Sequence, residues 1–137
     1  MSRREPAPVT AEDVARAFTS SEGFTILVGR SASDNDLLTF RVAEQDDFWM
    51  HVAATSGTHV VVRNPDRLAR LPKKTLREAA ALAVAHSKNR GGGRVDVHYT
   101  QRRNVRKSRG APAGQVELKR YETLRVSASE APAEAAG

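Results

Sequence analysis

The sequence predicts an α+β domain, in which two or three helices pack on a small, mainly antiparallel β-sheet. Two observations predict this class. Residues 76–88 are Ala-rich with apolar residues at helical spacing, whereas several shorter segments alternate apolar and polar residues as strands do. Turn-forming residues separate the short segments, which is typical of antiparallel connections. We expect the helices to cover one face of the sheet.

One domain accounts for the chain. Its 137 residues, 39% of them hydrophobic and 28% charged, suffice for one modest core. We expect the domain to span residues 10–126. Residues 1–9 and 127–137 lack periodic apolar character, so both are predicted to be disordered tails.

Two elements are expected before residue 31. Thr10 and Asp13 have the spacing of a capping box and would begin a short helix over residues 10–20. Its buried face would carry Val14, Ala17 and Phe18. Residues 24–30 are a compact run of apolar and β-branched residues, which predicts a strand leading into a turn.

Short polar side chains dominate residues 31–36, which suits a turn followed by a helix capped at Asp34 or Asn35. The helix would cover residues 37–45 with Leu38 and Val42 inward. A strand stays open as an alternative, because apolar residues also alternate here.

A β-hairpin is expected next. Residues 47–53 alternate in character, residues 58–64 form a second β-rich run, and the short loop Ala54–Gly57 joins them.

The clearest helix follows Thr75, which forms a second capping-box pattern with Glu78. Gly91–Gly93 would end it, with Lys88 and Arg90 in its last turn, where cations complement the helix dipole. Its packing face would carry Leu76, Ala79, Ala80 and Ala83.

The last part of the sheet would come from two segments. Residues 94–100 alternate as a strand, with Val95, Val97 and Tyr99 on one face, and residues 114–126 form a final strand or hairpin.

Composition excludes several classes of protein. The chain has no cysteine, so disulfides, Cys-ligated zinc and thiol nucleophiles are excluded. It also lacks an apolar run of about 18 residues, as a membrane span requires, and the apolar core of a secretory signal. We therefore expect a soluble, cytoplasmic protein without a membrane partner.

The positive charge is concentrated in one segment. Residues 86–110 carry eight Lys/Arg and one Asp, a formal charge of +7, whereas the whole chain carries +6. A local excess of cations is typical of surfaces that bind the phosphate backbone of nucleic acids. A solvated surface or a flexible basic loop is the alternative.

Arginine forks in this segment suit phosphate oxygens. On a loop or short helix, Arg102 and Arg103 would share a face with Arg106 and Arg109, and Lys107 lies between them in sequence. Exposed aromatic residues for base stacking are few, so recognition would depend on shape and backbone more than on base sequence.

A second group of polar residues could form a pocket. Trp49 and His51 are two residues apart on a strand and point to one face, where His59 could join them beside Asn35 and Asp36. Such a pocket could recognise a nucleotide end or a phosphate. The alternative is structural, with Trp49 half-buried at the sheet edge and His51 bonded to backbone.

The order of motifs resembles the NFACT-R family from about Phe24 to Val126. The landmarks are Asn35-Asp36, Leu38-Thr39, Trp49-x-His51, Gly57-Thr58-His59-Val60, the Ala-rich helix ending His86-Ser87-Lys88-x-Arg90, and Tyr99-Thr100, Val105-Arg106-Lys107, Gly110 and Gly114. Two departures are Arg103 in place of a common Lys and Ser56-Gly57-Thr58 in place of Pro-Gly-Ser. Neither changes the charge.

The resemblance implies RNA binding. Domains of this family are usually part of large proteins of ribosome-associated quality control, of the RqcH and NEMF type, which bind the obstructed large ribosomal subunit and tRNA and extend the stalled nascent chain. The family's other modules lie outside this sequence, so chain extension is not carried over. A stand-alone member is expected to bind tRNA or rRNA, with a link to quality control, other translation steps or RNA modification, and with the large subunit as a candidate partner.

Two other functions remain open. One is a protein adaptor that docks on the ribosome or a partner enzyme, favoured by an exposed apolar patch around Trp49. The other is a His-dependent RNA-modifying enzyme, which no His or carboxylate spacing supports. We predict no catalytic residue, metal ligand or cofactor. The predicted RNA-binding residues are Arg30, Asn35, Asp36, Trp49, His51, His59, Lys88, Arg90, Arg94, Arg102, Arg103, Arg106, Lys107 and Arg109.

Overall fold

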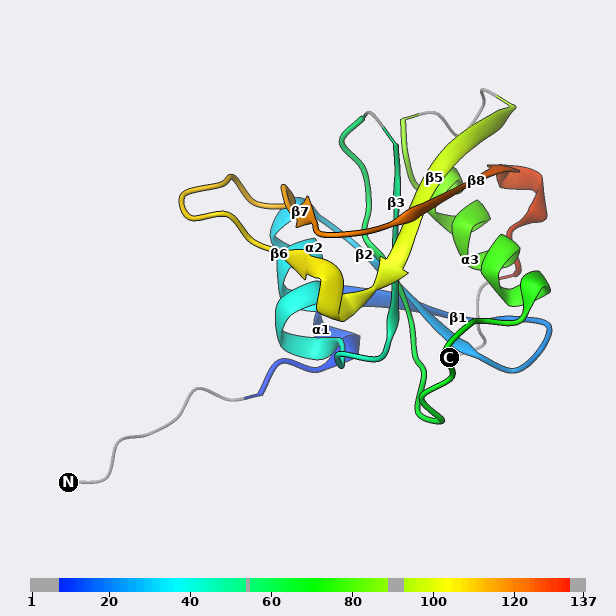
Figure 1. The fold of residues 1–137 in the computed structure, drawn as a ribbon, viewed down its shortest axis with the longest axis horizontal. Helices are drawn as coiled ribbons and strands as arrows, with labels where there is room; N and C mark the ends of the chain where they lie inside the picture. Colours follow the sequence, from blue (N-terminus) through cyan, green and yellow to red (C-terminus); the bar gives the residue numbers. More distant parts are fainter. Residues whose placement is uncertain (1–7, 54, 89–92, 134–137) are drawn as a thin grey trace.

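Six antiparallel strands form the central sheet, with helices on both of its faces (Figure 1). The computed structural model describes residues 8–53, 55–88 and 93–133. The predicted α+β class is confirmed. The prediction that the helices cover only one face is wrong, because α3 lies on one side of the sheet and α1 and α2 lie on the other.

The strand order in the sheet is β1-β2-β4-β3-β5-β8. Each neighbouring pair is antiparallel. A separate two-stranded sheet pairs β6 with β7. The strands are β1 (Ala15–Thr19), β2 (Thr25–Gly29), β3 (Phe48–Val52), β4 (Val60–Val62), β5 (Arg94–Gln101), β6 (Val105–Arg106), β7 (Glu117–Leu118) and β8 (Glu122–Ser127).

The helical elements in the described residues are mostly short. The longest is α3, whereas η1 is a π-helical turn that directly continues α2, and η2 and η3 are 3₁₀ turns. Their bounds are α1 (Ala11–Val14), α2 (Ala32–Leu37), η1 (Leu38–Val42), α3 (Lys73–Ala85), η2 (Arg102–Asn104) and η3 (Ala128–Glu130).

The sheet separates two apolar cores. On one face, the Ala-rich side of α3 packs on residues such as Ile26, Met50 and Val60, as the sequence predicts. On the other face, Trp49 and Val61 pack with residues of α1 and η1. Because both faces are covered, the central strands β2, β3 and β4 are nearly continuous apolar runs, unlike strands with one solvated face.

The predicted helix over residues 10–20 is only partly correct. The Asp13 carboxylate accepts a hydrogen bond from the Thr10 backbone N–H at 3.1 Å, so the helix begins as predicted. It ends at Val14, and Ala15–Thr19 instead forms the edge strand β1 against β2. Pairing with a neighbouring strand overrides local helix preference here.

Residues 37–42 of the predicted helix 37–45 are helical, but the helix both starts and ends earlier than predicted, at Ala32 and Val42. Its N-cap is Ser31, whose hydroxyl accepts a hydrogen bond from the Asp34 N–H at 3.1 Å. Asn35 cannot serve as the cap because it is buried and its side chain contacts the loop before β4.

The predicted capping box of Thr75 and Glu78 does not form. Helix α3 begins at Lys73, so Thr75 lies in its first turn, where the Glu22 carboxylate accepts hydrogen bonds from both its N–H and its hydroxyl at 2.8 Å. Glu78 accepts a bond from the Ser21 N–H. The caps therefore come from the β1–β2 turn. The helix ends at Ala85, which leaves Lys88 beyond the last turn, and Arg90 lies outside the described residues together with Gly91 and Gly92.

The predicted C-terminal boundary falls too early. Residues 127–131 are folded, because η3 follows β8 directly and Glu130 accepts two hydrogen bonds from Arg77 on α3. Ala128 and Ala131 pack on the core beneath α3. Residues 1–7 and 134–137 of the predicted tails lie outside the described residues.

Pairing of the hairpin strands β3 and β4 is confirmed. Ala54, in the predicted loop between them, lies outside the described residues. The strand at residues 94–100 is confirmed as β5, and Val95, Val97 and Tyr99 all contact the α3 core. Residues 114–126 contribute two strands that pair with different partners, β7 with β6 and β8 with β5.

Candidate functional site

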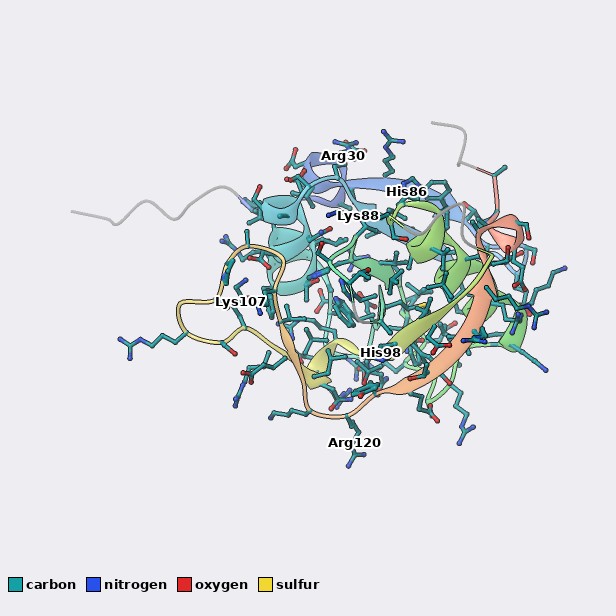
Figure 2. All side chains as sticks on the ribbon, turned by 90° about the horizontal axis from the view of Figure 1, so that it is seen from above. Arg30, His86, Lys88, His98, Lys107 and Arg120 are labelled. Atoms are coloured by element: carbon teal, nitrogen blue, oxygen red, sulfur yellow. The ribbon has the colours of Figure 1, made fainter. Side chains whose placement is uncertain are left out.

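A pocket of about 940 Å³ opens where four parts of the chain meet. The walls come from the start of α2, from β3 and the loop after it, from the end of α3, and from residues 113–121 with the facing part of β5. Figure 2 looks at the molecule from above relative to Figure 1 and labels three lining residues, His86, Lys88 and His98.

The lining of the pocket combines apolar and polar side chains and carries no carboxylate among the described residues. One lysine and three histidines supply its nitrogen groups, and serine, threonine and tyrosine hydroxyls surround them. Such a set favours an anionic or hydrogen-bonding ligand over a cation. The side chains in question are His51, Thr55, Ser56, Thr58, His86, Ser87, Lys88, His98 and Tyr121.

Trp49 and His59 are core residues beside this pocket: Trp49 contributes to its lining, whereas His59 is outside the lining. The Trp49 indole N–H donates to the Thr39 hydroxyl at 3.0 Å, and that hydroxyl lies 2.8 Å from Nδ1 of His59. Nε2 of His59 lies 2.9 Å from the carbonyl oxygen of Gly114. A carbonyl can only accept, so Nε2 carries the proton and Nδ1 accepts from Thr39. This chain of bonds fits a neutral imidazole.

Burial lowers the pKa of His59 to about 4, with the nearby imidazole of His51 acting in the same direction. The His59 side chain is fully buried and Trp49 is 1% exposed. The alternative that placed Trp49 half-buried at the sheet edge is therefore wrong, since β3 is an interior strand covered on both faces. Direct contact of His59 with a nucleotide is not compatible with this burial.

His51 is placed differently. Its ring is only partly buried, it stacks on the Trp49 ring at 5.9 Å between centroids, and it lines the pocket. Burial lowers its pKa, while the backbone of Val52 and of Gly57 acts in the opposite direction. The sequence analysis left two roles open for His51, a pocket residue or a structural residue bonded to the backbone. The structure shows both, because His51 lines the pocket and also has backbone partners.

Asn35 and Asp36 hold the walls of the pocket in place. Asn35 Oδ1 accepts from the His59 backbone N–H at 3.1 Å, and its amide donates to the Gly57 carbonyl at 3.4 Å. Asp36 accepts from the Gly114 N–H at 3.0 Å and forms an ion pair with Lys107 at 2.9 Å. Asn35 lines the pocket, whereas Asp36 acts by fixing the segment around Gly114.

The arginines predicted to share a face do not do so. The turn η2 ends at Asn104 and a strand follows, so helical spacing is lost. Arg102 points inward, donates to the carbonyl oxygens of Thr39 and Val105, and lies 4.7 Å from the centre of the Phe40 ring. Burial lowers the pKa of its guanidinium.

Unlike Arg102, three other cations of residues 86–110 have anionic partners within the molecule. Arg103 pairs with Asp46, Arg106 with Glu117, and Lys107 with Asp36. Arg94 is the first residue of β5, whose eight residues rise roughly 3.3 Å each, and Arg102 directly follows the strand. These two arginines are therefore about 26 Å apart along the strand, so the described cations of residues 86–110 do not form one patch.

Exposed cations nonetheless surround the pocket. Lys88 lines it, Arg30 precedes the lining residue Ser31, and Arg120 precedes the lining residue Tyr121. In Figure 2, Arg30 and Arg120 lie at opposite sides of the molecule, with Lys88 between them. The predicted residues Arg94 and Arg109 are also exposed, at the start of β5 and in the β6–β7 loop.

The decisive comparison is with family models: residues 15–120 match the model described as NFACT protein RNA binding domain. The chain belongs to this family. The match extends from β1 to the residue before Tyr121 and therefore includes most of the pocket. The NFACT-R resemblance seen in the sequence is confirmed.

Relatives of this NFACT-R domain are much longer proteins. The Rqc2 homolog RqcH of Bacillus subtilis is 39% identical over 83% of the chain, which covers 19% of that relative. The Rqc2 homolog RqcH of Streptococcus suis is 31% identical over 95% of the chain, and the aligned region covers 23% of that relative. The chain thus spans about a fifth of the length of these relatives. Coiled-coil domain-containing protein 25 of Bos taurus is 28% identical over 80% of the chain, covering 55% of that protein.

A solved structure has the same fold. It is the C-terminal part of the fibronectin/fibrinogen-binding protein from Streptococcus suis, with a TM-score of 0.77 and 30% identity, covering 83% of this chain and 45% of that one.

Two functional candidates of this NFACT-R domain escaped the sequence analysis. His98 lies opposite His51 across the β3–β5 pair, and the ring of Tyr121 lies 4.2 Å from the His98 ring. Tyr121 is 51% exposed, the only large hydrophobic side chain among the described residues with such exposure. The motifs Trp49-x-His51 and Gly57-Thr58-His59 directed attention to other residues, and no local pattern marks a tyrosine just before a strand as a pocket wall.

Two features are absent from the described residues. No group of three or more His, Asp or Glu side chains is arranged to hold a metal ion there. Among the same residues, no helix is long and apolar enough to cross a bilayer.

Proposed function

We propose that this NFACT-R domain binds RNA, of transfer or ribosomal origin, on the face that carries the pocket. The family's description as an RNA binding domain supports RNA as the ligand. Relatives described as Rqc2 homolog RqcH and, in Saccharomyces cerevisiae, as ribosome quality control complex subunit 2 support a role in ribosome-associated quality control, with the large subunit as the partner. We place the protein in the cytoplasm for the same reason.

The observation that carries the proposal is a pocket without carboxylates, surrounded by exposed cations. An RNA strand brings one negative charge per nucleotide, and a pocket lining without carboxylates accepts such a charge without like-charge repulsion inside the pocket. Because several cations of the 86–110 segment are already paired within the protein, we assign most of the affinity to the cations around the pocket. They are Lys88 in the lining and Arg30 and Arg120 next to it in sequence, to which we add the exposed Arg109 of the β6–β7 loop.

The adaptor alternative has less support. It requires an exposed apolar patch around Trp49, and Trp49 is only 1% exposed. Across the described residues, one exposed tyrosine is a small surface for docking another protein.

Crosslinking in cells followed by sequencing of the attached RNA tests the proposed ligand. We expect tRNA or rRNA to be enriched over a background control. Recovery of RNA no richer in either class than the control would refute the proposal.

Titration with salt tests where the RNA binds. Each phosphate contact on a single strand contributes about 0.7 to the log–log slope of affinity against salt. Replacing the four cations Arg30, Lys88, Arg109 and Arg120 by Gln should lower the slope by up to about 3. The matched control replaces four exposed cations outside the pocket lining by Gln and should change the slope much less. These are Arg16, Arg41, Lys73 and Lys74.

A further inference from the structure

We propose that the pocket holds one unstacked nucleotide of a bound RNA strand, with its base against Tyr121 and its phosphate at Lys88. This inference rests on the proposed RNA-binding function and names the part of the RNA that the pocket takes. Its volume of about 940 Å³ is in the range of pockets that enclose small-molecule ligands, so a single nucleotide has room to enter.

Tyr121 supplies a platform for the base. Its ring packs on His98 at 4.2 Å with the planes tilted by 35°, yet 51% of the residue remains exposed. An aromatic ring that is supported on one side and open on the other can stack with an unpaired base. Stacking tolerates any base, which agrees with the small number of amide side chains in the lining.

Lys88 supplies the charge. Among the described residues it is the one Lys or Arg in the lining, and no Asp or Glu lines the pocket to neutralise it. The lining hydroxyls of Thr55 and Ser56 lie in the loop after β3 and can donate to phosphate or sugar oxygens, whereas the Thr58 hydroxyl donates to the Gly29 carbonyl at 2.8 Å.

The walls are fixed before any ligand arrives. Gly114 is held at its N–H by Asp36 and at its carbonyl by His59, so one wall is tied to α2 and to the core. His51 stacks on the buried Trp49, so the floor is tied to β3. Binding to a preformed site loses little conformational entropy, which favours recognition of one nucleotide.

The arrangement of cations indicates how the strand continues. Arg30 and Arg120 lie on opposite sides of the molecule in Figure 2, with Lys88 between them. A strand whose central nucleotide enters the pocket can extend toward each of these arginines, so that phosphates farther along the strand come near them. A base that stays stacked in a duplex cannot enter, so the pocket selects single-stranded or looped RNA.

Three single variants test the inference by titration with a single-stranded RNA octamer and with an RNA duplex. Tyr121→Ala should weaken binding of the single strand by about tenfold or more and leave duplex binding within about twofold. Tyr121→Phe should keep single-strand binding, because it keeps the ring. Lys88→Gln should weaken binding of the single strand more than its matched control Lys73→Gln, which removes a lysine near the other end of α3. Thermal melting checks that each variant is folded.

Nuclear magnetic resonance with small probes localises the site. Adenosine and uridine monophosphate should shift the backbone signals of His51, Lys88, His98 and Tyr121 more than inorganic phosphate does. Equal shifts and affinities for phosphate alone would overturn the nucleotide assignment.

The outcomes separate this inference from the proposed function. If the wild-type protein binds neither RNA, the proposed function fails. If it binds RNA but Tyr121→Ala weakens single strand and duplex equally, or neither, RNA binding stands and the nucleotide pocket is overturned.

Discussion

The imidazole of His59 and the hydroxyl of Thr39 are hydrogen-bonded at 2.8 Å, and both side chains are fully buried. Thr39 accepts in turn from Trp49, and His59 bonds to Gly114. In this arrangement the Thr39 hydroxyl donates its proton to Nδ1 of His59, so His59 is neutral. A second proton on Nδ1 would break this hydrogen bond. Protonation of His59 therefore opposes the folded state.

This relationship predicts a loss of stability in acid. Folding lowers the pKa of His59 from 6.5 to about 4, so unfolded chains take up the proton first as the pH falls. The contribution of His59 to the free energy of unfolding is complete above pH 6.5 and decreases from there toward pH 4, by about 3 kcal/mol in total. Urea unfolding at several pH values measures it.

Two variants make the pH prediction specific. His59→Gln should be less stable than wild type at pH 7, and its stability should fall less between pH 7 and pH 4. Thr39→Ser keeps the hydroxyl and should keep the wild-type pH dependence. An unchanged pH dependence in His59→Gln would contradict the assignment.

A second prediction concerns Gly29 at the end of β2. A methyl group there would overlap the side-chain oxygen of Asn35 and lie 3.3 Å from its Cα. Asn35 is buried and accepts a hydrogen bond from the His59 N–H, so it cannot move without losing that bond. We expect Gly29→Ala to lower the free energy of unfolding by about 2–4 kcal/mol.

The control for Gly29 is Gly57→Ala in the loop before β4. A Cβ at Gly57 would meet its nearest neighbours at 3.7 and 3.8 Å, which is ordinary contact. Chemical unfolding should therefore show a much smaller loss for Gly57→Ala. Equal losses for the two variants would show that the contact with Asn35 is not the cause.

A third prediction separates structural from RNA-binding arginines. Arg102→Gln removes a bond to the Val105 carbonyl at 3.1 Å and the contact with the Phe40 ring, so it should destabilise the fold by about 1–2 kcal/mol. Its effect on the salt dependence of RNA binding should be small, because the guanidinium faces inward.

Arg109→Gln should behave in the opposite way. Arg109 is exposed in the β6–β7 loop, so its loss should leave the melting temperature unchanged and lower the salt slope by about 0.7. Melting and salt titration of both variants decide the matter. A steeper loss of RNA affinity in folded Arg102→Gln than in Arg109→Gln would reverse the assignment.

Local patterns were enough to predict much of the fold. The apolar, β-branched run at residues 24–30 and the alternation in residues 47–53 and 94–100 predict strands that the structure confirms as β2, β3 and β5. The Ala-rich face of α3 packs as expected, because a period of 3.6 residues determines which side is apolar. The errors fall at the ends of elements. Residues from other parts of the chain determine where elements begin and end, as Glu22 does at the start of α3.

The sequence alone determined the class of the domain, its main strands, its longest helix and its family resemblance, because these depend on short-range periodicity and on the order of motifs. Tertiary structure alone decided which polar residues meet. It buried Trp49 and His59, turned Arg102 inward, and brought His51, Lys88, His98 and Tyr121 to one pocket from β3, the end of α3, β5 and the start of β8. The physical reason is that strand pairing and two-sided burial bring together residues far apart in the chain, and each polar group then takes the partner available there.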